Sequence, residues 1–284
     1  MIDPTARCPK WLIDRIGDSG GSISFYRYMD LVLNDPDNGF YSTGKLNIGK
    51  NGDFCTSPSL SNDFARLLAI QVVDWLLDLE KSGIDSKLLS LIEIGPGEGT
   101  LSRDLIVAIS EIAPALICKI ELVLVELNVG MRRRQEKVVN NLEGINCRWS
   151  SIEDLILRPV TGVVIANEVL DAFPVERLVF SDNKVFRQGV SLKKINDEYS
   201  LEFVDLKPTS KIIKFLKESN SLLKIEFPPK DICNRWVTEW HCDVPSWFGN
   251  LSKVLLDGAL LVVDYAMESK RYYNAMRQDG TLIS

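Results

Sequence analysis

The stretch Leu91-Ile-Glu-Ile-Gly-Pro-Gly-Glu-Gly-Thr100 decides the fold class of this chain. It follows on from the apolar run 88–94, which predicts a buried strand, and it leads into 100–112, which has the pattern of a helix. The turn between strand and helix holds three glycines, Gly95, Gly97 and Gly99. Glycine allows positive φ and close approach of the backbone to a ligand, so this order predicts the first unit of a nucleotide-binding α/β fold.

Strands and helices continue to alternate after this turn. Further apolar runs predict core strands over 119–125, 145–149, 162–166 and 259–264. Helices are expected over 130–141 and 247–256. Short strands separated by short helices favour an α/β fold with a doubly wound, mainly parallel sheet, and the near-continuous apolar runs fit burial on both faces.

Two further regions frame this sheet. Residues 1–83 are expected to form an N-terminal helical and loop region that contributes to the site, and 84–284 a Rossmann-like domain. Within the latter, 184–245 resembles an inserted α+β segment that begins with a hairpin turning at Asn196-Asp197. In the N-terminal region, Ser57-Pro58 predicts the start of a helix, with Pro58 at the first helical position.

Composition excludes several classes of protein. The chain has 284 residues, with 33 Lys and Arg against 39 Asp and Glu, so its net charge is −6. An acidic chain is a poor candidate for binding a nucleic-acid backbone or an anionic membrane. The charge suits a basic substrate, but it is also what solubility alone favours.

Metal binding and secretion are also disfavoured by the sequence. One His and six Cys lack the spacing of a zinc site, so we expect no metal and reduced cysteines. No apolar run is long enough to span a bilayer, and the first ten residues lack a signal core. These features predict a reducing, cytoplasmic type of compartment.

Two acids beside the glycine turn indicate the kind of cofactor. Glu126 ends the second predicted core strand, 27 residues after Gly99, where an acid can accept both hydroxyls of a ribose. This spacing alone does not separate NAD from S-adenosylmethionine. The turn is one residue shorter than the dinucleotide pattern G-x-G-x-x-G, and Glu98 puts a negative charge where a pyrophosphate would bind. Glu93 could receive an ammonium group, so a cofactor with a sulfonium, an ammonium and a ribose fits better.

A polar cluster follows the fourth predicted core strand. Asn167, Glu168 and Asp171 come at the carboxyl end of the sheet, where open α/β folds bind ligands. Glu168 and Asp171 would share a face if the segment is helical. They are either an acid pair that complements a helix N-terminus or a pair that clamps a guanidinium through bidentate hydrogen bonds.

Three motifs together resemble the MidA-like S-adenosylmethionine-dependent methyltransferases. They are Gly52-Asp-Phe-Cys-Thr-Ser-Pro58, Glu93-Ile-Gly-Pro-Gly-Glu-Gly-Thr100 and Asn167-Glu-Val-Leu-Asp-Ala-Phe-Pro-Val175. Asn38-Gly-Phe-Tyr41 and Asp279-Gly-Thr-Leu282 extend the resemblance over nearly the whole chain. The mitochondrial members of this family are complex I assembly factors that dimethylate an arginine of a complex I subunit. The family usually continues further beyond the D-G-T-L motif.

The residues and this resemblance together imply a class I methyltransferase-like fold and a set of site residues. Cofactor contacts are expected from Glu93, Gly95, Gly97, Gly99, Thr100, Glu126, Thr56, Ser57 and Pro58. The candidate catalytic residues are Asn167 and Glu168, at the boundary between cofactor and substrate, and Asp171 close by. The implied activity is arginine N-methylation of a protein, linked to assembly of a respiratory NADH dehydrogenase-type complex. The implied compartment is the cytoplasm, or the mitochondrial matrix in a eukaryote.

Two other functions remain open from the sequence. One is a methyltransferase for a small molecule, and the other is a non-catalytic assembly chaperone that keeps the methyltransferase fold. An NAD-dependent oxidoreductase is less favoured, because no catalytic His, Tyr-x-x-x-Lys or Cys pattern accompanies the glycine turn.

Overall fold

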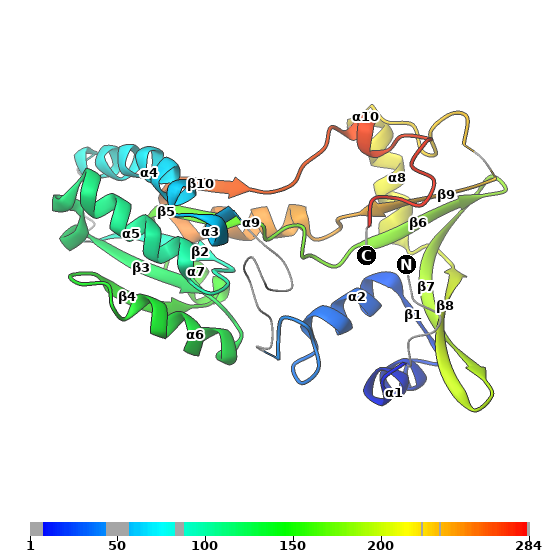
Figure 1. Ribbon diagram of the computed structural model, residues 1–284. Helices are drawn as coiled ribbons and strands as arrows, with labels where there is room; N and C mark the ends of the chain where they lie inside the picture. The colour runs from blue at the N-terminus through cyan, green and yellow to red at the C-terminus, as the bar shows by residue number, and fades with distance from the viewer. Residues whose placement is uncertain (1–7, 44–56, 83–87, 223, 233, 283–284) are drawn as a thin grey trace. The chain divides into compact units, whose positions relative to one another are not determined.

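The chain folds into two compact units in the computed structural model, which describes residues 8–43, 57–82, 88–222, 224–232 and 234–282 (Figure 1). Unit 1 consists of Met1–Gly39, Phe173–Cys242 and Ala266–Ser284, and unit 2 of Phe40–Ala172 and Asp243–Tyr265. Each unit is built on its own five-stranded sheet.

The sheet of unit 2 is parallel throughout. Its strands are β2 (Leu89–Ile94), β3 (Ile120–Val125), β4 (Asn146–Ser150), β5 (Val160–Asn167) and β10 (Leu255–Val263). Their order across the sheet is β10-β5-β2-β3-β4, and every neighbouring pair is parallel. This confirms the parallel sheet that the alternating apolar runs predict.

The strand order reverses at β2. The chain adds β3 and β4 on one side of β2, then returns to add β5 and β10 on the other side. The crevice outside the carboxyl ends of β2 and β5 is therefore a topological switch point, where open α/β sheets bind ligands. Ile94 pairs with Ala166, so the turn after β2 and the turn after β5 start next to each other.

Helices cover both faces of this sheet. Those of unit 2 are α3 (Ser57–Leu60), α4 (Asp63–Lys81), α5 (Thr100–Ile112), the 3₁₀ helix η1 (Pro114–Lys119), α6 (Val129–Val139), α7 (Ile152–Leu157) and α9 (Val244–Val254). Helices α4 and α5 pack on the face that carries Leu91, Leu122 and Val163. Ile92 and Val164 alternate with these residues and are fully buried too, which confirms a doubly wound sheet.

The helix expected to begin at Ser57 is divided in two. A short α3 ends at Leu60, and α4 begins at Asp63 rather than continuing from it. The hydroxyl of Ser61 accepts a hydrogen bond from the backbone N–H of Asp63 at 3.2 Å. Such local side-chain bonds compete with helical backbone bonds, which explains the break between the two helices.

Unit 1 holds an antiparallel sheet. Its strands are β1 (Ser22–Ser24), β6 (Glu176–Ser181), β7 (Lys184–Ile195), β8 (Glu198–Leu206) and β9 (Arg235–Trp240), and its helices are α1 (Lys10–Asp18), α2 (Phe25–Asn34), α8 (Ser210–Leu222) and α10 (Ser269–Tyr272). Strands β7 and β8 form the predicted hairpin. Its turn residues Asn196 and Asp197 have φ of 50° and 64°, which is the conformation of a tight two-residue hairpin turn.

The two units follow a different division from the expected regions 1–83 and 84–284. Strand β1 pairs antiparallel with β7, with Ile23 opposite Val190, so the N-terminal residues join the same unit as the inserted segment. Helix α4 instead packs on the parallel sheet and belongs to unit 2. Pairing between strands far apart in sequence sets this division, and local composition carries no sign of such pairing.

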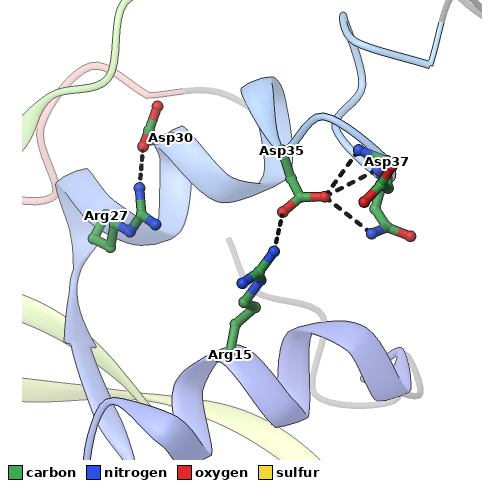
Figure 2. A network of polar contacts seen from close by, with 6 residues as sticks. Arg15, Arg27, Asp30, Asp35 and Asp37 are labelled. Carbon is green, nitrogen blue, oxygen red and sulfur yellow. Dashed lines mark hydrogen bonds and ion pairs between the residues drawn. The ribbon is translucent and has the colours of Figure 1, made fainter.

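The turn after α2 is organised by one buried carboxylate (Figure 2). Asp35 accepts hydrogen bonds from the backbone N–H groups of Asp37 and Asn38, at 3.2 and 3.1 Å, and from the Asn38 amide at 3.0 Å. Arg15 of α1 pairs with the other oxygen of Asp35 at 3.4 Å. Burial opposes the charge, but these bonds outweigh it and hold the pKa of Asp35 below its usual value.

A second polar network explains the Asp279-Gly-Thr-Leu282 motif. The Arg177 guanidinium donates to Glu239 Oε1 at 3.1 Å and to the backbone carbonyl of Asp279 at 2.5 Å. The other oxygen of Glu239 accepts hydrogen bonds from the N–H and hydroxyl of Thr281, at 2.8 and 3.0 Å. A Cβ at Gly280 would lie 2.1 Å from the Glu239 carboxylate. The motif therefore closes over a buried ion pair of unit 1, which is a structural role.

Candidate cofactor and substrate site

The glycine turn after β2 has the open backbone that a ligand needs. Gly95, Gly97 and Gly99 all have positive φ, at 62°, 53° and 81°, a region that L side chains rarely adopt. The N–H of Gly99 donates to the Pro96 carbonyl at 2.7 Å, which closes the turn before α5 begins at Thr100. Gly95 is exposed, so its backbone can meet a ligand directly.

Glu126 lies at the end of β3 with unused acceptor capacity. Its Oε1 accepts the backbone N–H of Asn128 at 2.9 Å, and its Oε2 accepts the side-chain amide of Gln135 at 3.2 Å. An ionised carboxylate can accept about four hydrogen bonds, so acceptor capacity remains for a ribose hydroxyl. Burial raises the pKa of Glu126, and the bonds from Asn128 and Gln135 oppose that rise.

Glu93 is buried inside the strand rather than open at its end. The residue is 4% exposed, and its carboxylate accepts a hydrogen bond from the hydroxyl of Ser102 on α5. Burial raises the pKa of Glu93 to about 7, against the lowering effect of Ser102. A cation brought to this carboxylate would favour its ionised form.

Glu98 does not present a free negative charge at the helix N-terminus. It pairs with Arg134 of α6 at 2.7 Å. This pair offsets the charge expected to repel a pyrophosphate, so the shape of the turn carries more of the argument against a dinucleotide than Glu98 does. The feature that differs from a dinucleotide turn is the spacing G-x-G-x-G, which is one residue shorter than G-x-G-x-x-G.

Asn167 ends β5 with an unsatisfied oxygen. Its Oδ1 is buried and has no hydrogen-bond partner within the part of the chain that the structure describes. A buried polar atom without a partner is costly, because it has lost water and gained nothing in exchange. A ligand that donates a hydrogen bond here would remove that cost.

Glu168 has an unusual backbone conformation for a residue other than glycine. Its φ is 50°, and strain of this kind gathers at functional sites. The carbonyl of Val263 on β10 accepts the N–H of Glu168 at 2.8 Å. The carboxylate of Asp264 accepts the next two N–H groups, from Val169 at 3.0 Å and from Leu170 at 2.7 Å. The end of β10 therefore fixes the turn that presents Glu168, and this turn is not a helix.

Two carboxylates, Asp264 and Glu168, act on a third, Asp171, at this edge of the sheet. Burial raises the pKa of Asp171, and the nearby charges of Asp264 and Glu168 raise it further. The same carboxylates act on Tyr265, where Glu168 has the largest effect in raising the pKa of the phenol. Tyr41 lies near Asp171, and the pKa of its phenol rises through burial and through the Asp171 charge. The result is a concentration of negative charge at the carboxyl ends of β5 and β10.

The structure describes only some of the N-terminal residues that the sequence predicts to contact the cofactor. Thr56 lies outside the described residues, as does most of the motif that contains it. Ser57 begins α3, and Pro58 of the same helix is buried. Helix α3 contacts α5, the helix that follows the glycine turn. Their assignment to the cofactor site stays a prediction.

Two residues of this site are absent from the sequence-based set. Asp264 could have been found by the rule that led to Asn167, since it also follows a core strand at its carboxyl end. Gln135 carries no such signal, because it lies in the middle of a polar helix and only the packing of α6 brings it to the turn. Within the described ranges, no group of three or more His, Cys, Asp or Glu residues could hold a metal ion.

The residues present fit S-adenosylmethionine. The turn offers open glycine backbone, and Glu126 keeps acceptor capacity for a ribose hydroxyl. Asn167 Oδ1 is a buried acceptor without a hydrogen-bond partner among the described residues. A side chain at Gly95 would approach Val169 Cγ2 to 3.2 Å, so the two turns already lie close together without one. All of these groups belong to unit 2.

This sheet order and site define a class I methyltransferase-like fold, as the sequence predicts. The chain belongs to the family described as "Putative S-adenosyl-L-methionine-dependent methyltransferase", which matches residues 67–284. The cofactor of this family is S-adenosylmethionine.

Comparison with solved structures and curated proteins agrees with this assignment. A COG1565 superfamily member from Burkholderia thailandensis, solved with S-adenosyl-homocysteine bound, is 30% identical with a TM-score of 0.78. The match covers 95% of this chain and 65% of that one. The mitochondrial protein arginine methyltransferase NDUFAF7 of Xenopus laevis is 37% identical over 67% of this chain and 44% of its own length. Its Xenopus tropicalis counterpart is 32% identical over 56% of this chain and 40% of its own. The chain thus spans less than half the length of these curated relatives.

Proposed function

We propose that the protein is an S-adenosylmethionine-dependent arginine N-methyltransferase that acts on a protein substrate. The observation that carries this proposal is the group of carboxylates Glu168, Asp171 and Asp264 beside the glycine turn. Such a group favours a cation, and a guanidinium offers five donors in one plane to carboxylate oxygens. The relatives named protein arginine methyltransferases support the same substrate class.

The three carboxylates have different tasks in this proposal. Asp264 accepts backbone N–H groups from Val169, Leu170 and Tyr265, so it is a positioning residue for the turn. Glu168 and Asp171 hold the guanidinium through charge-assisted hydrogen bonds. They draw its positive charge toward themselves and away from the nitrogen that is methylated. That nitrogen must lose a proton, and Asp171, whose pKa is raised by burial and by nearby carboxylates, is the acceptor in this proposal.

Positioning supplies most of the acceleration. Bound S-adenosylmethionine supplies a methyl group activated by a sulfonium. The chain holds a guanidine nitrogen in line with that group, and orienting two reactants in this way lowers the barrier by several kcal/mol, roughly 7–11 in favourable cases. Asn167 lies at the boundary between the two ligands, where its unsatisfied oxygen accepts a hydrogen bond.

The cofactor contacts follow from the turn and its neighbours. Gly95, Gly97, Gly99 and Thr100 would present the backbone, Glu126 would accept the ribose hydroxyls, and Glu93 would pair with the ammonium group. Thr56, Ser57 and Pro58 complete the set from the N-terminal side. The fit of a phosphate-free cofactor to this turn supports these assignments.

The substrate in this proposal is a subunit of a respiratory NADH dehydrogenase-type complex, met in the cytoplasm or in the mitochondrial matrix. The mitochondrial relatives support such a compartment. Among the described residues, Cys8, Cys118 and Cys147 are free thiols, which suits a reducing environment. No helix among the described residues is long and apolar enough to cross a membrane.

Mass spectrometry of respiratory-complex subunits from cells with and without the gene tests this function. Methylarginine should be lost at a defined site when the gene is absent and should return with the wild-type gene. A gene for the Glu168→Gln variant should not restore it. Methylation found on lysine or on a small molecule would contradict the arginine assignment, and assembly rescued by the variant would favour a chaperone.

A further inference from the structure

Gln135 connects three parts of the cofactor site. It lies on α6, and it is completely buried although its side chain is polar. Its Nε2 donates to the carbonyl of Gly97 at 2.8 Å and to Glu126 Oε2 at 3.2 Å. Its Oε1 accepts the indole N–H of Trp149 on β4 at 2.8 Å. One amide therefore joins the glycine turn, the end of β3 and a strand at the edge of the sheet.

Trp149 fixes the direction in which this amide points. An indole nitrogen can only donate, so the oxygen of Gln135 must face Trp149. The NH₂ group must then face Gly97 and Glu126, and each of its two hydrogens has one acceptor. The arrangement leaves no polar atom of the Gln135 side chain unsatisfied. It also rules out the flipped amide, which would aim an oxygen at the Glu126 carboxylate.

The amide acts on Glu126 in two ways. It holds one carboxylate oxygen at a set position relative to the Gly97 carbonyl, and both atoms line the place proposed for the nucleoside. Its hydrogen bond also opposes the effect of burial, which raises the pKa of Glu126. Without this donor, Glu126 would be freer to turn and easier to protonate, and a protonated carboxyl is a poorer acceptor for hydroxyls.

We propose that Gln135 is a positioning residue for ribose recognition: oriented by Trp149, it holds Glu126 and the Gly97 carbonyl in the geometry that receives the ribose hydroxyls. This inference rests on the proposed placement of the cofactor at the turn. A purely structural Gln135 would support folding of α6 and would leave the preference for ribose hydroxyls unchanged.

Calorimetric titration with S-adenosylhomocysteine and its 2′-deoxy analogue distinguishes the two roles without any methyl transfer. Wild-type protein should bind the deoxy analogue about tenfold more weakly, the effect of one charged hydrogen bond. Gln135→Met keeps the size and removes the donors, so this ratio should fall below about threefold. Trp149→Phe frees the amide to flip, so its ratio should lie in between.

Val139→Ala serves as the control on the same helix. Val139 is buried in the main core and touches none of the three hydrogen bonds, so this variant should melt at a lower temperature and keep the tenfold ratio. Cofactor affinity measured against pH gives a second readout. The acid limb of the Gln135→Met profile should move to higher pH, because Glu126 then binds a proton more readily.

The possible outcomes distinguish a failure of the proposed role of Gln135 from a failure of the proposed methyltransferase function. A tenfold ratio that survives in Gln135→Met, or in Trp149→Phe if the former does not fold, overturns the role of Gln135 and leaves the cofactor site intact. A wild-type protein that binds S-adenosylhomocysteine but shows no preference for the hydroxyl removes Glu126 from the ribose, and the role of Gln135 with it. A wild-type protein that binds no S-adenosylhomocysteine contradicts the proposed function itself.

Discussion

Asp264 Oδ2 lies 2.7 Å from the backbone nitrogen of Leu170, so the end of one core strand holds the turn that follows its neighbour. Asp264 directly follows β10, whose last residue, Val263, pairs with Asn167 at the end of β5. The left-handed conformation of Glu168 depends on this attachment, because a strained residue persists only where its surroundings hold it in place.

Asp264→Asn should therefore lower both stability and methyl transfer. An amide has one oxygen, so it cannot keep the bonds to Leu170 and Tyr265 at the same time. We expect a loss of about 1–3 kcal/mol in the free energy of unfolding and at least a tenfold drop in transfer rate. Denaturant unfolding and single-turnover kinetics measure the two effects. Asp257→Asn, at an exposed position of the same strand, is the control and should change neither.

Glu168→Gln and Asp171→Asn should each reduce transfer far more than cofactor affinity. Both substitutions keep the shape of the side chain and remove the charge that pairs with a guanidinium. Loss of an interaction that matters in the transition state lowers kcat with little effect on binding of the other ligand. Melting temperature, calorimetry and single-turnover transfer should be compared with Glu143→Gln, an exposed acid elsewhere in unit 2. Full activity in Glu168→Gln would remove that residue from the mechanism.

Glu93 should make the stability of the protein depend on pH in an unusual direction. Its pKa is raised from 4.5 to about 7 by burial, so the folded state keeps a proton that the unfolded state releases. Stability from this group is fully present below about pH 4.5 and is lost as pH rises toward 7. Glu93→Gln stays neutral, so above pH 7 it should be more stable than wild type by on the order of 3 kcal/mol. Equal pH profiles of unfolding for the two proteins would mean that Glu93 is not shifted.

The buried Arg177–Glu239 pair should matter to stability more than any surface pair of unit 1. The Glu239 side chain is 1% exposed. Removing its charge leaves the buried Arg177 guanidinium without its carboxylate partner. Glu239→Gln should cost about 3–5 kcal/mol in unfolding free energy. Asp205→Asn breaks the exposed pair with Arg235 and should cost about 0–1 kcal/mol. Similar losses in the two variants would contradict the structural reading of the Asp279-Gly-Thr-Leu282 motif.

Local pattern was enough to predict the parallel sheet and to select several residues of the candidate site. The apolar runs predict all five strands of unit 2, and the run after the glycine turn predicts α5 with the bounds that the structure gives it. The carboxyl-end rule selects Glu126 and Asn167, because the position of a residue at the end of a buried strand is visible in the sequence.

The rest depends on contacts between distant segments. Strand β1 is only three residues long, and its position is set by pairing with β7. No local sequence pattern predicts that pairing. Gln135 reaches the turn because α6 packs there, and a polar residue inside a polar helix looks like a solvated one. Glu168 and Asp171 would share a face only if their segment were helical, but Glu168 has positive φ and its N–H bonds to β10, so the segment forms a turn instead.

The most direct test of the account is calorimetric titration of S-adenosylmethionine into wild-type protein and the Gly97→Val variant. Gly97 has φ of 53°, so valine there is strained and its side chain would enter the space assigned to the cofactor. We predict that wild type binds S-adenosylmethionine and prefers it to NAD, and that Gly97→Val loses binding while its circular dichroism spectrum stays close to that of wild type. Unchanged affinity in a folded Gly97→Val variant, or tighter binding of NAD by the wild type, would contradict the assignment of the site.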